Sequence, residues 1–186
     1  MRIMRDIPSN LVAGGIKSSN LGQLVYENMK EKNIECKCIR CREVSQKMDE
    51  GLTPEPDQIK LKREVYEAGG GKEIFLSFED EKNNILIGFT RLRIPNEPFR
   101  PEITRDTAVN RELHVYGAMV ELGEKADSKW QHRGYGRELM KEAERIAKEE
   151  FDKLEILVTS GIGVRPYYQN LGYHKKGVYM AKKLRK

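Results

Sequence analysis

Apolar and polar residues follow one pattern before three consecutive glycines at 69–71 and another pattern after them. Before the glycines, apolar residues recur at three- and four-residue spacing over 20–32, which predicts an amphipathic helix. A proline-rich turn precedes 56–67 and predicts that a second helix begins there. Glycine commonly follows the last residue of a helix, so we expect the glycines to end this second helix.

Beyond the glycines the pattern alternates between strands and helices. Alternating apolar and polar residues predict a hairpin over 74–94, and the proline-rich, charged segment 95–110 predicts a surface loop. The remaining expected elements are a strand at 112–122, a helix at 136–151, a strand at 154–159, a short helix from Pro166 and a strand at 173–184. We therefore expect a linker region at 1–71 and an α/β domain at 72–186.

The composition fits a globular protein, because 38% of the residues are hydrophobic and 34% are charged. No apolar run approaches the roughly 20 residues that a membrane helix needs, and the first residues lack the hydrophobic core of a signal peptide. We expect a cytoplasmic protein without a membrane partner.

The net charge of +5 is concentrated at the carboxyl-terminal end. Residues 165–186 carry seven lysines and arginines and no acidic residue. Such a cluster attracts phosphate-rich partners, although a lysine-rich solvated end would look the same. The candidate nucleic-acid contacts are Lys175, Lys176, Lys182, Lys183, Arg185 and Lys186.

All three cysteines, Cys36, Cys38 and Cys41, lie within six residues. Their odd number and short spacing make a poor disulfide framework. Grouped thiolates favour a soft metal such as zinc, for which this motif supplies three of four tetrahedral ligands. The alternative is a group of reduced thiols without a metal.

The segment before the 136–151 helix has the pattern of a phosphate-binding loop. Gly134 and Gly136 allow the backbone to approach a ligand, and the unpaired N–H groups at a helix start attract anions. Two glycines before a helix also occur in ordinary tight turns. Gln131-x-x-Gly134-x-Gly136, placed between two predicted strands, resembles the coenzyme A pyrophosphate loop of the GNAT N-acetyltransferase superfamily.

Further motifs narrow this resemblance. They are Arg111-Glu112-Leu113-His114-Val115-Tyr116-Gly117, Glu142-Ala143-Glu144-Arg145-Ile146-Ala147, Tyr167-Tyr168-x-x-Leu171-Gly172-Tyr173, Tyr179-Met180 and Arg40-Cys41-Arg42-Glu43-Val44. With these motifs the chain resembles, over essentially its whole length, the acetyltransferase domain and linker of the Elongator catalytic subunits, including the archaeal tRNA uridine(34) acetyltransferases. The resemblance implies a GNAT acyl-CoA N-acyltransferase fold with a mixed central sheet flanked by helices.

The resemblance also implies an acetyl-CoA site. We expect the pyrophosphate at Gln131, His132, Arg133, Gly134, Tyr135 and Gly136, and the pantetheine along Glu112, Leu113, His114 and Val115. Tyr168, with Tyr167 beside it, would lie near the thioester sulfur and act as a general acid. An aromatic pair packed in the core is the alternative. Candidates for a general base are Glu112, His114, Glu121 and His132.

The family's full-length proteins add a radical S-adenosylmethionine domain with an iron–sulfur cluster on a Cys-x-x-x-Cys-x-x-Cys motif, which this sequence lacks. We therefore expect a fragment whose partners are acetyl-CoA, tRNA and that missing domain, and whose cysteine cluster is a structural metal site. The implied function is carboxymethyl-type modification at C5 of the wobble uridine, and the fragment alone is expected to bind or hydrolyse acetyl-CoA.

Two other functions compete with this one. A protein lysine or small-molecule amine N-acetyltransferase would share the same fold and cofactor loop. A non-catalytic tRNA-binding module would keep the fold and the basic end without the chemistry, which the tyrosine pair makes less attractive.

Overall fold

The computed structural model describes residues 10, 13–15, 20–98, 100–117 and 134–184. Contacts between Cα atoms divide the chain into two units, Met1–Arg42 and Glu43–Lys186. The linker at 1–71 and the domain at 72–186 expected from the sequence stay a prediction. Among the described residues, no helix is both long enough and apolar enough to cross a membrane.

The first unit contains α1 (Leu21–Glu31), as the helical spacing over 20–32 predicts, and α2 (Ile39–Arg42). Cys36 and Cys38 lie in the segment between these helices, and Cys41 lies in α2. The sequence analysis did not predict α2, which is only one turn long.

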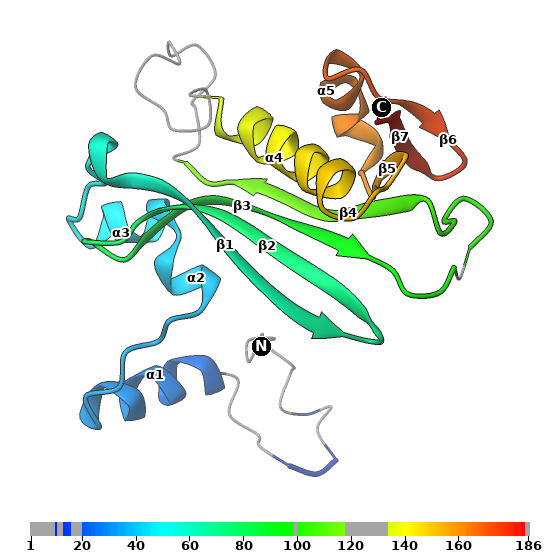
Figure 1. Cartoon of the computed structure of the whole chain (residues 1–186). Coiled ribbons are helices and arrows are strands. Elements are labelled where there is room, and N and C mark those ends of the chain that lie inside the picture. The colour runs from blue at the N-terminus through cyan, green and yellow to red at the C-terminus, as the bar shows by residue number, and fades with distance from the viewer. Residues whose placement is uncertain (1–9, 11–12, 16–19, 99, 118–133, 185–186) are drawn as a thin grey trace. The chain divides into compact units, whose positions relative to one another are not determined.

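The second unit is built on one mixed sheet of seven strands in the order β1-β2-β3-β4-β5-β7-β6 (Figure 1). Among the described strands, β4 and β5 pair in parallel and every other neighbouring pair is antiparallel. The strands are β1 (Ile59–Ala68), β2 (Gly71–Asp80), β3 (Ile85–Ile94), β4 (Thr107–Val115), β5 (Glu155–Val158), β6 (His174–Lys176) and β7 (Tyr179–Lys183). This mixed sheet with flanking helices confirms the predicted fold class.

Helix α4 (Tyr135–Glu149) connects β4 to β5 and packs on one face of the sheet, over β2, β3 and β4 (Figure 1). Its buried residues recur at helical spacing and join the core of the sheet. They are Leu139, Met140, Ala143, Ile146 and Ala147. Within its described residues this unit also contains the helices α3 (Val44–Asp49) and α5 (Arg165–Asn170), with short 3-10 turns η2 (Pro56–Gln58) and η5 (Ile162–Val164).

The helix predicted at 56–67 is wrong, because these residues form η2 and then strand β1. Gly69 and Gly70 have φ angles of +48° and +72°, so they form a two-residue turn from β1 into β2. Paired glycines with positive φ are typical of tight hairpins. The ten residue pairs between β1 and β2 outweigh the local helical spacing.

Two strand boundaries also differ from the prediction. Strand β4 begins at Thr107 rather than at 112, because residues 107–110 are buried and pair with β5. The strand expected at 173–184 is a hairpin of β6 and β7, with Gly177 in its turn at a φ of +58°. The hairpin at 74–94, the helix after Gly134, the strand near 154–159 and the helix from Pro166 are confirmed.

Candidate functional site

A gap in the sheet opens where β4 and β5 separate. Their parallel pairing ends with Asn110 and Val158, whereas β4 continues along β3 to Val115. The last contact across the gap is the Thr159 N–H donating to Asn110 O at 3.0 Å. Beyond Asn110, therefore, the β5 side of β4 faces no strand within the described residues, and its backbone groups can pair with an extended ligand.

A β-bulge lies at the start of this free segment. Arg91 pairs with Glu112 and Leu92 pairs with Asn110, so Arg111 is the extra residue in β4. Asn110 is fully buried, and with its amide nitrogen turned toward the sheet it donates to Arg91 O at 2.9 Å and to Glu112 O at 3.1 Å. Buried Thr90 also donates to Glu112 O, at 2.7 Å. These bonds hold the irregular backbone in place.

The bulge decides which side chains face α4. Asn110 lies beside Met140 of α4, and Val115 lies close to Gly136 at its start. Glu112 forms an ion pair with Arg91 at 3.4 Å on the other face, where the His114 ring lies tilted against Phe89 with a centroid distance of 5.2 Å. The general-base candidates Glu112 and His114 thus lie on the face of the sheet away from α4.

Helix α4 starts at the free end of β4. Gly134, the residue before the helix, has a φ of +84° and open space around it. The point where a Cβ of Gly136 would lie is 2.8 Å from the Tyr167 hydroxyl and 3.5 Å from Val115 Cγ2. The start of α4, the end of β4 and the exposed tyrosine of α5 therefore meet at one place. The predicted loop residues Gln131, His132 and Arg133 and the base candidate Glu121 lie outside the described residues.

The two tyrosines of α5 occupy different surroundings. Tyr167 is 39% exposed, whereas Tyr168 is 5% exposed. The Tyr168 ring packs edge-on against Tyr167 at 5.2 Å and against Tyr173 at 5.9 Å. Burial, with a smaller contribution from Tyr167, raises the pKa of Tyr168 to about 12. Burial also raises the pKa of Tyr167. Both hydroxyls keep their protons at neutral pH, as a general acid requires.

The carboxyl-terminal lysines are not a uniform row of free charges. Lys176 pairs with Glu155 at 2.5 Å and Lys182 pairs with Glu144 at 2.7 Å. Lys175 and Lys183 are exposed. Arg185 and Lys186 lie outside the described residues. Two of the four described lysines are therefore already neutralised by carboxylates.

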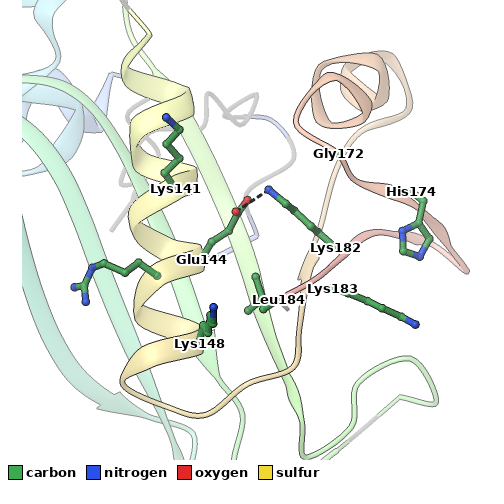
Figure 2. Close-up of a pocket in the computed structure, with 9 residues that line it drawn as sticks. Lys141, Glu144, Lys148, Gly172, His174, Lys182, Lys183 and Leu184 are labelled. Carbon is green, nitrogen blue, oxygen red and sulfur yellow. Dashed lines mark hydrogen bonds and ion pairs between the residues drawn. The ribbon is translucent and has the colours of Figure 1, made fainter. Parts of the chain in front are cut away.

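A groove that the sequence analysis missed runs between α4 and the β6–β7 hairpin (Figure 2). It has a volume of about 640 Å³. A smaller hollow of about 200 Å³ adjoins it, and the two share Lys141, Glu144 and Lys182. One signal was available in the sequence: residues 137, 141, 144 and 148 follow the spacing of a single helix face, and three of them are basic.

The three cysteines form a compact cluster in the first unit. Their sulfur atoms lie within 4.8 Å of one another, and each cysteine is partly buried. Cys41 Sγ donates to the Tyr26 hydroxyl of α1 at 3.4 Å. Three soft donors at this spacing fit the ligand set of a metal site, and no fourth His, Cys, Asp or Glu joins the group within the described residues.

Known proteins are similar to this chain in both sequence and fold. Residues 40–173 match the acetyltransferase (GNAT) family. The tRNA uridine(34) acetyltransferase of Methanocaldococcus infernus is 59% identical over 185 residues, which are 98% of this chain and 35% of that protein. Elongator complex protein 3 of Saccharomyces cerevisiae is 46% identical over 187 residues, which are 98% of this chain and 33% of that protein.

A solved structure agrees with these similarities. The archaeal Methanocaldococcus infernus Elp3 with an N-terminal deletion superposes with a TM-score of 0.86 at 58% identity, covering 99% of this chain and 44% of that one.

This chain belongs to the acetyltransferase (GNAT) family, a class of acyltransferases. Within that class it is similar over nearly all its length to tRNA uridine(34) acetyltransferases and to Elongator complex protein 3. It spans about a third of the length of these curated relatives. The predicted resemblance and enzyme class are confirmed.

Proposed function

We propose that this chain is the acetyl-CoA-binding acetyltransferase domain of an Elongator-type tRNA-modifying protein. The observation that carries the proposal is the alignment of three features: the free edge of β4, the Gly134–Gly136 start of α4 and the tyrosine pair of α5. The start of α4, the end of β4 and Tyr167 meet at one place, and Tyr168 packs against Tyr167. An acyl-CoA needs the same sequence of contacts for its diphosphate, its amides and its thioester.

The residues have distinct roles in this proposal. The backbone N–H groups at the start of α4 bind the diphosphate, because they lie at the positive end of the helix dipole. The free edge of β4 around Leu113 pairs with the pantetheine amides. Tyr168 hydrogen-bonds the thioester sulfur. When an acceptor, which is water for the chain alone, attacks the acetyl carbon and the carbon–sulfur bond breaks, Tyr168 donates its proton to the departing CoA thiolate.

The substrate that we propose is tRNA, modified in a carboxymethyl-type reaction at C5 of the wobble uridine. The names of the archaeal relatives support this choice, since they describe uridine-34 acetyltransferases of tRNA. A radical S-adenosylmethionine domain would supply the carbon chemistry, and the greater length of the relatives leaves room for one. Exposed Lys175 and Lys183 are candidates for contacts with RNA phosphates.

Acetyl-CoA binding tests the proposal through Gly134→Trp. Gly134 and Gly51 share a φ of +84° and open space, but Gly51 follows α3, outside the proposed site. Tryptophan suffers the same backbone strain at both positions. Only the change at Gly134 places an indole at the proposed diphosphate, so titration calorimetry should show acetyl-CoA affinity falling by at least about tenfold in that variant alone.

Equal acetyl-CoA affinities in Gly134→Trp and Gly51→Trp would refute the diphosphate assignment. Two further measurements separate the competing functions. Rapid acetylation of a peptide or a polyamine by the chain would favour an amine N-acetyltransferase. Salt-dependent tRNA binding without any acetyl-CoA binding would favour an RNA-binding module, because phosphate neutralisation releases counterions.

We also propose that Cys36, Cys38 and Cys41 bind one zinc ion. The donor set carries this assignment, since three thiolates grouped within 4.8 Å suit zinc. All three cysteines are free of disulfide bonds. Purified chain should contain about one equivalent of zinc by elemental analysis, and Cys38→Ser should lose most of it. Ser45→Ala, on α3 and outside the cluster, is the control. Zinc content that stays the same in Cys38→Ser would contradict the site.

A further inference from the structure

Coenzyme A carries a third phosphate that the start of α4 does not account for. Two phosphates form its diphosphate, and the third is a monoester on the 3′ position of the ribose. A phosphate monoester has a charge of about −1.5 to −2 at neutral pH, so its recognition requires cationic side chains. A site for this phosphate rests on the proposed acetyl-CoA function and needs cations near the start of α4.

The groove beside α4 brings such cations together next to the helix start. Arg137 and Lys141 lie one turn apart on α4, and both line the smaller hollow with Lys182 of β7. Lys141 and Lys182 also line the larger groove. Figure 2 shows Lys182 and Glu144 pointing toward each other, with Lys141 on the neighbouring turn and directed toward the beginning of α4.

The single carboxylate of the hollow is already satisfied. Glu144 accepts a hydrogen bond from the Tyr173 hydroxyl at 2.8 Å and another from Lys182 Nζ at 2.7 Å. The Lys182 ammonium also lies 5.4 Å from the centre of the Tyr173 ring. These contacts fix Lys182 and neutralise Glu144. Lys141 and Arg137 are exposed and have no ion pair within the described residues, so their charges remain available.

The distance along the helix also fits. Each residue of an α-helix rises 1.5 Å, so the Lys141 backbone is about 9 Å from the first residue of α4. Helical side chains lean toward the amino-terminal end, which brings the Lys141 ammonium back toward Gly134–Gly136. A phosphate that is one ribose away from the diphosphate lies within this reach.

We propose that Lys141, assisted by Arg137, binds the 3′-phosphate of acetyl-CoA in this hollow. The pair makes the chain selective for phosphorylated coenzyme A over its 3′-dephospho form. Lys182 forms the opposite wall, where Glu144 holds it. The basic stripe on α4 is thus a cofactor-specificity element of the acetyltransferase domain.

Two ligands and three variants test the assignment. Affinities for acetyl-CoA and for acetyl-3′-dephospho-CoA are measured by calorimetry on the whole 186-residue chain. The unaltered chain should prefer acetyl-CoA by at least about tenfold, the scale of one charge-assisted hydrogen bond. In Lys141→Ala this preference should fall to about threefold or less, while affinity for the dephospho ligand stays within about twofold. Lys141→Arg should keep the preference.

Lys148→Ala is the matched control, since Lys148 lines the same groove about 10 Å further along α4. It should leave the preference unchanged. Equal affinities of the unaltered chain for both ligands would overturn the assignment, as would a Lys141→Ala variant that keeps the preference. The same holds if Lys141→Ala weakens tRNA binding and not this preference. If the unaltered chain binds neither ligand, the proposed acetyl-CoA function fails, and the 3′-phosphate assignment fails with it.

Discussion

Tyr168→Phe should cleave acetyl-CoA at least about 100-fold more slowly than the unaltered chain, the usual scale of general-acid catalysis. The change removes one hydroxyl and keeps the ring, so the edge-on contacts with Tyr167 and Tyr173 remain. Release of the CoA thiol under single-turnover conditions measures the rate. Affinity for acetyl-CoA should change little, because the hydroxyl acts mainly when the sulfur becomes a thiolate.

The raised pKa of Tyr168 gives this prediction a pH signature. Burial lifts that pKa to about 12, so the phenol stays protonated throughout the neutral and mildly alkaline range. The rate in the unaltered chain should therefore not fall through deprotonation of Tyr168 below about pH 11.

Tyr167→Phe is the paired control for Tyr168→Phe. Its hydroxyl lies beside Gly136, so it should affect binding of the cofactor more than the rate of bond cleavage. Unchanged thiol release in Tyr168→Phe would exclude this residue as the acid. A rate loss confined to Tyr167→Phe would transfer the role to its neighbour.

Glu73→Ala should lower the free energy of unfolding by about 3–5 kcal/mol, the usual loss when one partner of a buried ion pair is removed. Glu73 is almost fully buried on β2, and its Oε1 accepts from Arg93 at 3.2 Å and from Arg111 at 2.7 Å. Arg93 also donates to Gly69 O at 2.9 Å, so the carboxylate ties three strands to the β1–β2 turn. Without it, the largely buried Arg93 side chain keeps its charge and its bond to Gly69 O but loses its carboxylate partner.

Urea denaturation followed by far-ultraviolet circular dichroism measures this loss. Glu73→Gln should be milder, since the amide oxygen still accepts a hydrogen bond. The control is Glu81→Ala. Glu81 directly follows β2 and forms an exposed ion pair with Lys62, so its loss should barely change the midpoint of urea denaturation. Similar denaturation midpoints for Glu73→Ala and Glu81→Ala would show that the buried Glu73 ion pairs stabilise the fold no more than an exposed pair does.

The sequence predicts those parts of the fold whose periodicity is strong and local. Helix α4, the β2–β3 hairpin and the short helix with the tyrosine pair all lie close to their predicted positions. Segment 56–67 was misjudged because its strand structure comes from cross-strand pairing with β2, which a local pattern does not contain. The early start of β4 has a similar cause, since its pairing with β5 joins residues about 48 positions apart.

The sequence predicts which residues form the candidate site but not how they are arranged in space. The motifs placed Gly134, Gly136 and the tyrosine pair in one site, and the structure brings Gly136 and Tyr167 together. The sequence does not reveal that Glu144 holds Lys182, which removes this lysine from the free basic end. The sequence also does not reveal the groove beside α4, because its walls come from separate elements: Glu144 of α4 and Lys182 of β7 are 38 positions apart.

The extra residue at Arg111 sets which face of the sheet each following side chain of β4 occupies. A strand alternates its side chains between two faces, so straightening the bulge with Arg111 kept in the regular ladder would exchange the faces of Leu113, His114 and Val115. The imidazole would then turn toward α4, and the two aliphatic side chains would turn away from it. Removing Arg111 itself would leave these faces unchanged, because Asn110 and Glu112 already pair with the consecutive residues Leu92 and Arg91.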